Sequence, residues 1–135
     1  MNAKRLTCIL CPNGCELDVF VSGSPTAESI RVEGNLCPRG NGYALEELTA
    51  PKRTLTTSIL VRGGAQPQAS VKTTDPVLRE LLPKIRNVLR GTQVDAPVAI
   101  GDVVLSDVAQ SGVDVVITRA VPSATAPCPS HPTQV

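Results

Sequence analysis

The sequence has 135 residues, with 13 basic and 12 acidic side chains and a formal net charge of +1. This length corresponds to one domain or to two small lobes. The near-neutral charge gives no reason to expect nucleic acid or a membrane surface as a partner. One Phe, one Tyr and no Trp supply no stacking platform for bases. We therefore expect no nucleic-acid binding. We also expect no membrane span, because no segment approaches the ~20 apolar residues of a membrane-spanning helix.

Four cysteines stand out in the first forty residues. Cys8, Cys11 and Cys15 form a C-x2-C-x3-C run, and Cys37 follows after 21 intervening residues. The basic residues 1–6 precede no apolar stretch, so we expect no signal peptide and a cytoplasmic protein. In that reducing compartment, clustered cysteines bind metal more often than they form disulfides.

The spacing of these cysteines predicts a four-thiolate metal site. Three closely spaced cysteines and one remote cysteine followed by proline, as in Cys37-Pro38, are typical of iron–sulfur ligation and favour a 4Fe–4S cluster. Structural zinc more often uses two C-x2-C pairs, but it remains open as the alternative. Disulfides or free thiols are a third possibility.

The segment between Cys15 and Cys37 reads as a hairpin that delivers the fourth thiol. Leu17, Val19 and Val21 alternate as in a strand, residues 23–25 are turn-like, and residues 30–32 begin a returning strand. Residues 42–48 then predict a short helix that ends before Pro51 and packs against this lobe through an apolar stripe.

Residues 8–62 resemble the N-terminal iron–sulfur domain of molybdopterin oxidoreductases. The likeness rests on the cysteine spacing, on Cys37-Pro38-Arg39-Gly40 and on the segment Pro51-Lys52-Arg53-Thr54-Leu55-Thr56-Thr57. It implies that Arg39 lies beside the cluster, where that family has a basic residue between cluster and pterin. The large pterin-binding domains of those enzymes have no counterpart in 135 residues, so we expect no pterin cofactor.

The whole chain resembles a closer group, the small bacterial CxxC-motif proteins catalogued as a family of unknown function. That family's genes tend to lie beside flavin-dependent dehydrogenases resembling glycerol-3-phosphate dehydrogenase, which implies such a dehydrogenase as the partner. The shared features are the cysteine pattern, residues 40–46, Thr56-Thr57, Val71-Lys72-Thr73, Pro97, Gly101-Asp102-Val103 and Thr118-Arg119.

The second half predicts a hairpin followed by a helix. Residues 55–62 and 68–73 are strand-like around a glycine turn. We expect Asp75 to cap a helix, with an interior break at Pro83 that either kinks it or starts a new helix, and an end at Gly91. Its cations are a solvated face or a docking face for an acidic partner: Arg79, Lys84, Arg86 and Arg90.

Three further strands are expected at residues 97–100, 103–108 and 113–119, separated by turns at residues 101–102 and 111–112. Nothing in the spacing of Asp102, Asp107 and Asp114 brings their carboxylates together, so we expect no hydrolase. The Pro/Ser/Thr-rich residues 122–135 predict a flexible tail. Its Cys128 and His131 are incidental or alternative metal ligands, and without His131 the body of the protein has no near-neutral base.

Together these patterns predict an α+β protein with a metal-binding lobe (residues 1–50), an α+β lobe with one amphipathic helix (51–121) and a tail (122–135). The function expected is a small iron–sulfur electron-transfer or accessory subunit of a flavin-dependent dehydrogenase. It would be a redox subunit without catalysis of its own. Its ligands would be Cys8, Cys11, Cys15 and Cys37, with Arg39 at the cofactor. The alternative is a zinc-stabilised protein-binding module with no redox role.

Overall fold

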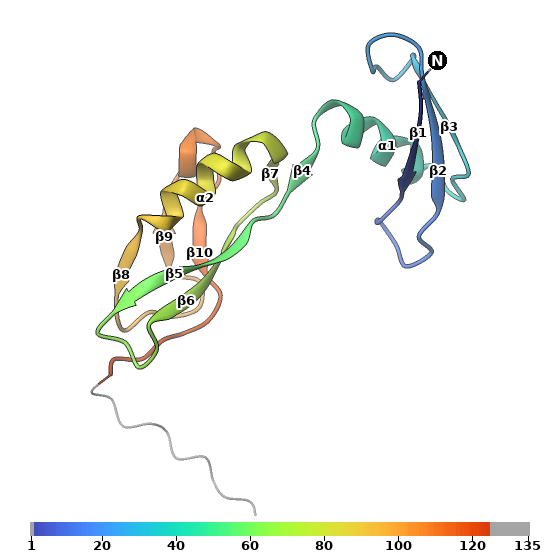
Figure 1. Cartoon of the computed structure of the whole chain (residues 1–135). Helices are drawn as coiled ribbons and strands as arrows, with labels where there is room; N and C mark the ends of the chain where they lie inside the picture. The colour runs from blue at the N-terminus through green and yellow to red at the C-terminus, as the bar shows by residue number, and fades with distance from the viewer. Residues whose placement is uncertain (1, 125–135) are drawn as a thin grey trace, which may run out of the picture. The chain divides into compact units, whose positions relative to one another are not determined.

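The computed structural model describes residues 2–124 and divides into two compact units, unit 1 (Met1–Lys52) and unit 2 (Arg53–Val135) (Figure 1). The strands and two α-helices confirm a mixed α+β protein. The predicted domain limits stay a prediction, because compact packing does not show that either part folds alone. Cys128 and His131 lie outside the described residues. None of the helices within residues 2–124 is long and apolar enough to cross a membrane.

Unit 1 is a three-stranded antiparallel sheet with one helix packed against it. The sheet has the order β1-β2-β3. Leu17 and Val19 alternate toward Ala44 of the helix, and these three side chains form a small core with Cys8. The elements are β1 (Asn2–Thr7), β2 (Glu16–Val21), β3 (Ile30–Glu33) and α1 (Arg39–Thr49).

The predicted hairpin in unit 1 is confirmed, but its third strand was not expected. Residues 2–7 show no apolar alternation, so only pairing with β2 identifies them as β1. Helix α1 begins at Arg39, three residues before the predicted start, because Pro38 already has helical backbone angles. Tyr43 and Leu48 pack against the small core, as the helical spacing predicted.

Unit 2 is built on a five-stranded sheet of order β8-β5-β6-β10-β9. Strands β5 and β8 run parallel, and the other neighbours are antiparallel. Ile85 and Leu89 of α2 belong to the core formed over one face of this sheet (Figure 1). The elements are β5 (Thr56–Arg62), β6 (Gln68–Thr73), α2 (Leu82–Arg90), β8 (Gln93–Asp95), β9 (Val103–Leu105) and β10 (Val115–Ile117), with β4 (Lys52–Arg53) and β7 (Val77–Leu78) as a separate ladder.

The predicted helix start at Asp75 is wrong. Strand β7 and a 3-10 turn (Arg79–Leu81) come first, and α2 then begins at Leu82. Pro83 is therefore in the first turn, where its missing N–H leaves no hydrogen bond unmade. This matches the alternative in which a new helix starts at Pro83. Gly91 is the C-terminal cap, as predicted.

The C-terminal strands are shorter than predicted. Residues 97–100 form no strand and share only an isolated bridge between Val98 and Val121. The turn at residues 101–102 is confirmed, since the Asp102 carboxylate accepts a hydrogen bond from the Ala99 N–H at 2.8 Å. Residues 122–124, assigned to the tail, are hydrogen-bonded to the turn after β5: the Ala124 N–H donates to the Gly63 carbonyl at 2.9 Å.

Candidate metal centre

The strand order of unit 1 brings the cysteine-bearing loops to one end of the sheet. Strand β1 ends at Thr7, which pairs with Glu16 at the start of β2. Strand β3 ends at Glu33, which pairs with Asp18 near that same end. The loop of residues 8–15 and the loop of residues 34–38 therefore leave the sheet side by side. All four thiols, from Cys8, Cys11, Cys15 and Cys37, lie on these two loops.

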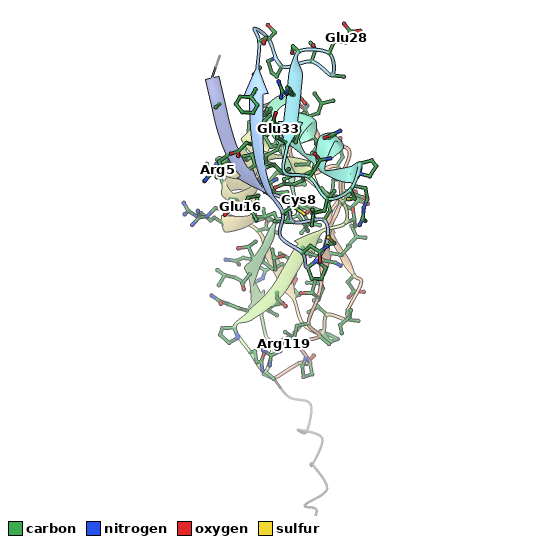
Figure 2. The ribbon with its side chains drawn as sticks, turned by 90° about the vertical axis from the view of Figure 1, so that its right-hand side faces the viewer. Arg5, Cys8, Glu16, Glu28, Glu33 and Arg119 are labelled. Carbon is green, nitrogen blue, oxygen red and sulfur yellow. The ribbon has the colours of Figure 1, made fainter. Side chains whose placement is uncertain are left out.

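The first loop is closed across its base. The Cys8 N–H donates a hydrogen bond to the Cys15 carbonyl at 2.9 Å. Gly14 has a φ of +58°, a left-handed conformation that turns the chain back toward Cys15. Cys8, which is labelled in Figure 2, is buried in the small core at the end of β1. Cys11 and Cys15 are half-buried. Cys8 is thus the inner member of the set.

The second loop is pressed onto the start of β2. A Cβ added to Gly34 would overlap the Glu16 carbonyl oxygen, and one added to Gly40 would lie 2.7 Å from the Asn35 Cβ. The Asn35 side-chain amide donates to the Cys37 carbonyl at 3.1 Å. Only glycine permits contacts this close at positions 34 and 40. The two glycines therefore hold the loop that carries Cys37 beside Glu16, which follows Cys15 in the sequence.

Cys37 occupies the N-terminal end of α1, where the backbone N–H groups have no partner within the helix. The pKa of the Cys37 thiol is lowered, and the largest cause is the hydrogen bond from the Arg39 backbone N–H to the sulfur. The Arg39 side chain and the Gly40 N–H lower this pKa further, whereas burial raises it. Thiolate, rather than thiol, is the form that binds metal. The residue predicted to lie at the cofactor, Arg39, therefore interacts with one of the predicted ligands.

The donor set suits a soft metal or an iron–sulfur cluster, since it offers four sulfurs and all four thiols are free of disulfides. The geometry is incomplete. Within residues 2–124 no three His, Cys, Asp or Glu side chains are grouped closely enough to hold a metal ion. The residues fit the group by chemistry and by loop placement, whereas their side chains are not grouped as a bound metal would hold them.

Exposed aliphatic side chains next to the cysteines were not singled out from the sequence. Ile9 is 69% exposed, Leu10 is 48% exposed and Leu36 is 78% exposed. These side chains leave apolar surface uncovered on the two loops that carry the thiols. Their position directly beside Cys8, Cys11 and Cys37 was the available signal.

The three aspartates of unit 2 have structural roles. Asp102 holds the turn at residues 101–102, as described above. Asp107 accepts a hydrogen bond from the Gly112 N–H at 2.6 Å, and Asp114 accepts one from the Asp107 N–H at 3.0 Å. These carboxylates organise the loop of residues 107–114, whose Asp107 has a positive φ of 46°.

The molecule is thus a small α+β protein with a cysteine-bearing unit. Residues 38–119, more than half of the chain, match the family described as "Protein of unknown function (DUF1667)". The chain belongs to this family. The matched segment begins at Pro38, so it includes Arg39 and most of unit 2 but none of the four cysteines.

A solved structure extends the comparison. The NMR structure of Clostridium perfringens protein CPE0013, a structural genomics target, is 28% identical, with a TM-score of 0.52. The alignment covers 59% of this chain and 95% of that chain. The rest of this chain lies outside the alignment. No curated protein matches the chain.

Proposed function

We propose that unit 1 holds an iron–sulfur cluster through Cys8, Cys11, Cys15 and Cys37, and that the protein is a small electron-transfer or accessory subunit. The observation that carries the proposal is the emergence of all four thiols from two adjoining loops at one end of one sheet. Four thiolates are the ligand set that a 4Fe–4S cluster requires.

A bound cluster would supply one-electron chemistry, and the chain's own groups would set its potential. The N–H groups of Arg39 and Gly40 already favour negative charge on the Cys37 sulfur. The guanidinium of Arg39 adds a positive charge at the same place. Hydrogen bonds to sulfur and a nearby cation favour the reduced form, so Arg39 would raise the reduction potential.

The partner in this proposal is a flavin-dependent dehydrogenase of the cytoplasm. The partner class comes from the resemblance of the whole chain to the small bacterial CxxC-motif proteins, whose genes tend to lie beside such dehydrogenases. The exposed Ile9, Leu10 and Leu36 support docking of a partner on these loops. Each of them is next to a cysteine in the sequence, so a partner that covers them would lie close to the thiols. Electrons would then pass over a short distance, and the protein itself would make no covalent change.

Zinc is the second candidate, and the small core of unit 1 favours it. Among the described residues of unit 1, the hydrophobic cluster has four buried members: Cys8, Leu17, Val19 and Ala44. So small a core normally needs a cross-link or a metal, and a zinc ion on the four thiolates would supply folding energy without redox chemistry. The protein would then be a binding module whose metal is purely structural.

Anaerobic purification followed by metal analysis and absorption spectroscopy distinguishes the two. We expect about four irons per chain and a broad band near ~400 nm that dithionite bleaches. Cys15→Ser and Cys37→Ser should lose the metal, whereas Cys128→Ser, which removes a cysteine outside the set, should retain it. One zinc per chain without colour would replace the cluster by the structural alternative. Full metal content in both Cys15→Ser and Cys37→Ser would refute the site.

A further inference from the structure

The face of the unit 2 sheet opposite its core carries a row of hydroxyl groups. Ser58 of β5 pairs directly with Ser70 of β6. On the other side of β6, the Thr118 N–H donates to the Ser70 carbonyl at 2.8 Å, so Thr118 lies next to Ser70 at the end of β10. The alternating residues Ile59 and Ala69 point to the core. Three hydroxyls therefore lie side by side across three strands.

A cavity of about 330 Å³ opens beside this row, between the β5–β6 hairpin and the residue that follows Thr118. Its polar lining comes from Ser58, Gln66, Gln68, Ser70 and Arg119. Figure 2 shows Arg119 at the hairpin end of unit 2. None of the residues that line the cavity is acidic, and Arg119 is its one charged group.

The hydrogen bonds of the hydroxyl row leave a donor available to the cavity. The Thr118 hydroxyl donates to the Ser70 oxygen at 2.7 Å. A hydrogen bond between two hydroxyls uses one O–H, so the Thr118–Ser70 pair keeps a second O–H that is able to donate. No carboxylate of residues 2–124 forms an ion pair with Arg119, so its guanidinium also keeps its donors.

We propose that this cavity binds the oxyanion group of a small molecule, either a carboxylate or a phosphate ester. A guanidinium presents two parallel N–H donors to such a group, and the serine hydroxyls and glutamine amides add neutral donors around it. A volume of about 330 Å³ accommodates a small metabolite. The site lies in unit 2 and uses no cysteine, so it is independent of the metal proposed for unit 1.

The other cations of unit 2 provide the matched control. Arg86 is exposed on α2 and lines no part of this cavity. Arg86→Gln removes the same charge as Arg119→Gln while leaving the cavity intact. If anions bind only through non-specific attraction to positive charge, both variants should bind them more weakly. If they bind in this cavity, only Arg119→Gln should bind them more weakly.

The test is an NMR titration of the full-length, ¹⁵N-labelled protein with inorganic phosphate and, separately, with citrate, at ionic strength held constant with sodium chloride. We expect saturable shifts of the Ser70 and Arg119 amides with at least one of the two anions, which also identifies the source of the oxyanion. Arg119→Gln should weaken binding about tenfold or more and Ser70→Ala should weaken it several-fold, each with an otherwise native spectrum. Arg86→Gln should bind as the wild type does. Absence of saturable shifts with both anions, or equal weakening by Arg86→Gln, would overturn the proposal.

Discussion

The two units differ most in what their cores contain. Unit 2 buries twelve side chains in one cluster, drawn from four strands (β5, β6, β7 and β10), from α2 and from the segments that flank β10. Unit 1 buries four, and one of those is Cys8, a predicted metal ligand. A core of this size supplies little hydrophobic stabilisation against the entropy of ordering the chain. Unit 2 therefore has a packed core of its own, whereas we expect unit 1 to need the metal proposed at its cysteines.

The largest effect should come from removing the proposed metal. We expect unit 1 to lose its folded structure while unit 2 stays folded. A chelator under reducing conditions should abolish the hydrogen-exchange protection of Leu17 and Val19 in β2. Val71 and Val115 in the five-stranded sheet should keep theirs, because both are fully buried in a core that contains no cysteine. Unchanged protection in both units would show that unit 1 does not depend on metal.

The second largest effect should come from truncating a side chain in the core of unit 2. Ile85→Ala removes a fully buried side chain of α2 and should lower the free energy of unfolding by about 2–5 kcal/mol. Val88→Ala on the same helix, where the side chain is 42% exposed, should change it by about 0.5 kcal/mol or less. Urea unfolding of the metal-loaded protein measures both. Similar losses in the two variants would contradict the packing of α2 described here.

A pair of glycines tests the loop that carries Cys37. Gly34 and Gly23 have nearly the same positive φ, +87° and +85°, so alanine at either costs about 1–2 kcal/mol from the backbone alone. A Cβ at Gly23 meets nothing, whereas one at Gly34 overlaps the Glu16 carbonyl. Gly34→Ala should therefore cost about 1–3 kcal/mol more than Gly23→Ala and weaken metal retention. Thermal unfolding and metal content of the two variants provide the measurement, and equal values would show that the contact does not matter.

Sequence reasoning located the elements whose patterns are local. Alternation identified β2, and the glycine turn between β5 and β6 identified that hairpin. It missed β1 and β8, because β1 is polar and β8 pairs in parallel with the distant β5, so only tertiary pairing defines them.

The candidate site divides in the same way. Cysteine spacing predicted the four candidate ligands, but their common origin at one sheet end follows from strand order. The cavity beside Arg119 depends on the register of three strands, which composition and periodicity do not encode. Such features need the sheet to be assembled first.

The smallest effect concerns Cys37, and it is measured in metal-free protein that an osmolyte keeps folded, with hydrogen-exchange protection of the β2 amides as the check on folding. Hydrogen bonds from Arg39 lower the pKa of the Cys37 thiol, so its alkylation by iodoacetamide should begin at lower pH than for the same residue in urea. Arg39→Gln should move the reaction part of the way back, since the backbone N–H remains. Mass spectrometry of the Cys37 peptide follows the rate, and identical pH profiles in folded and urea-unfolded protein would contradict the lowered pKa.

The sign of the accompanying stability change follows from the same shift. A thiol with a lowered pKa in the folded state stabilises that state at pH values above its ordinary pKa, and the contribution is lost as the pH falls through the lowered value. Proton release thus accompanies folding around Cys37. Unit 1 differs from unit 2 in its small core and in its cysteines, and the end of α1 connects the two differences. This end favours the thiolate form of Cys37, and a metal ion bound there would supply stability that the small core does not.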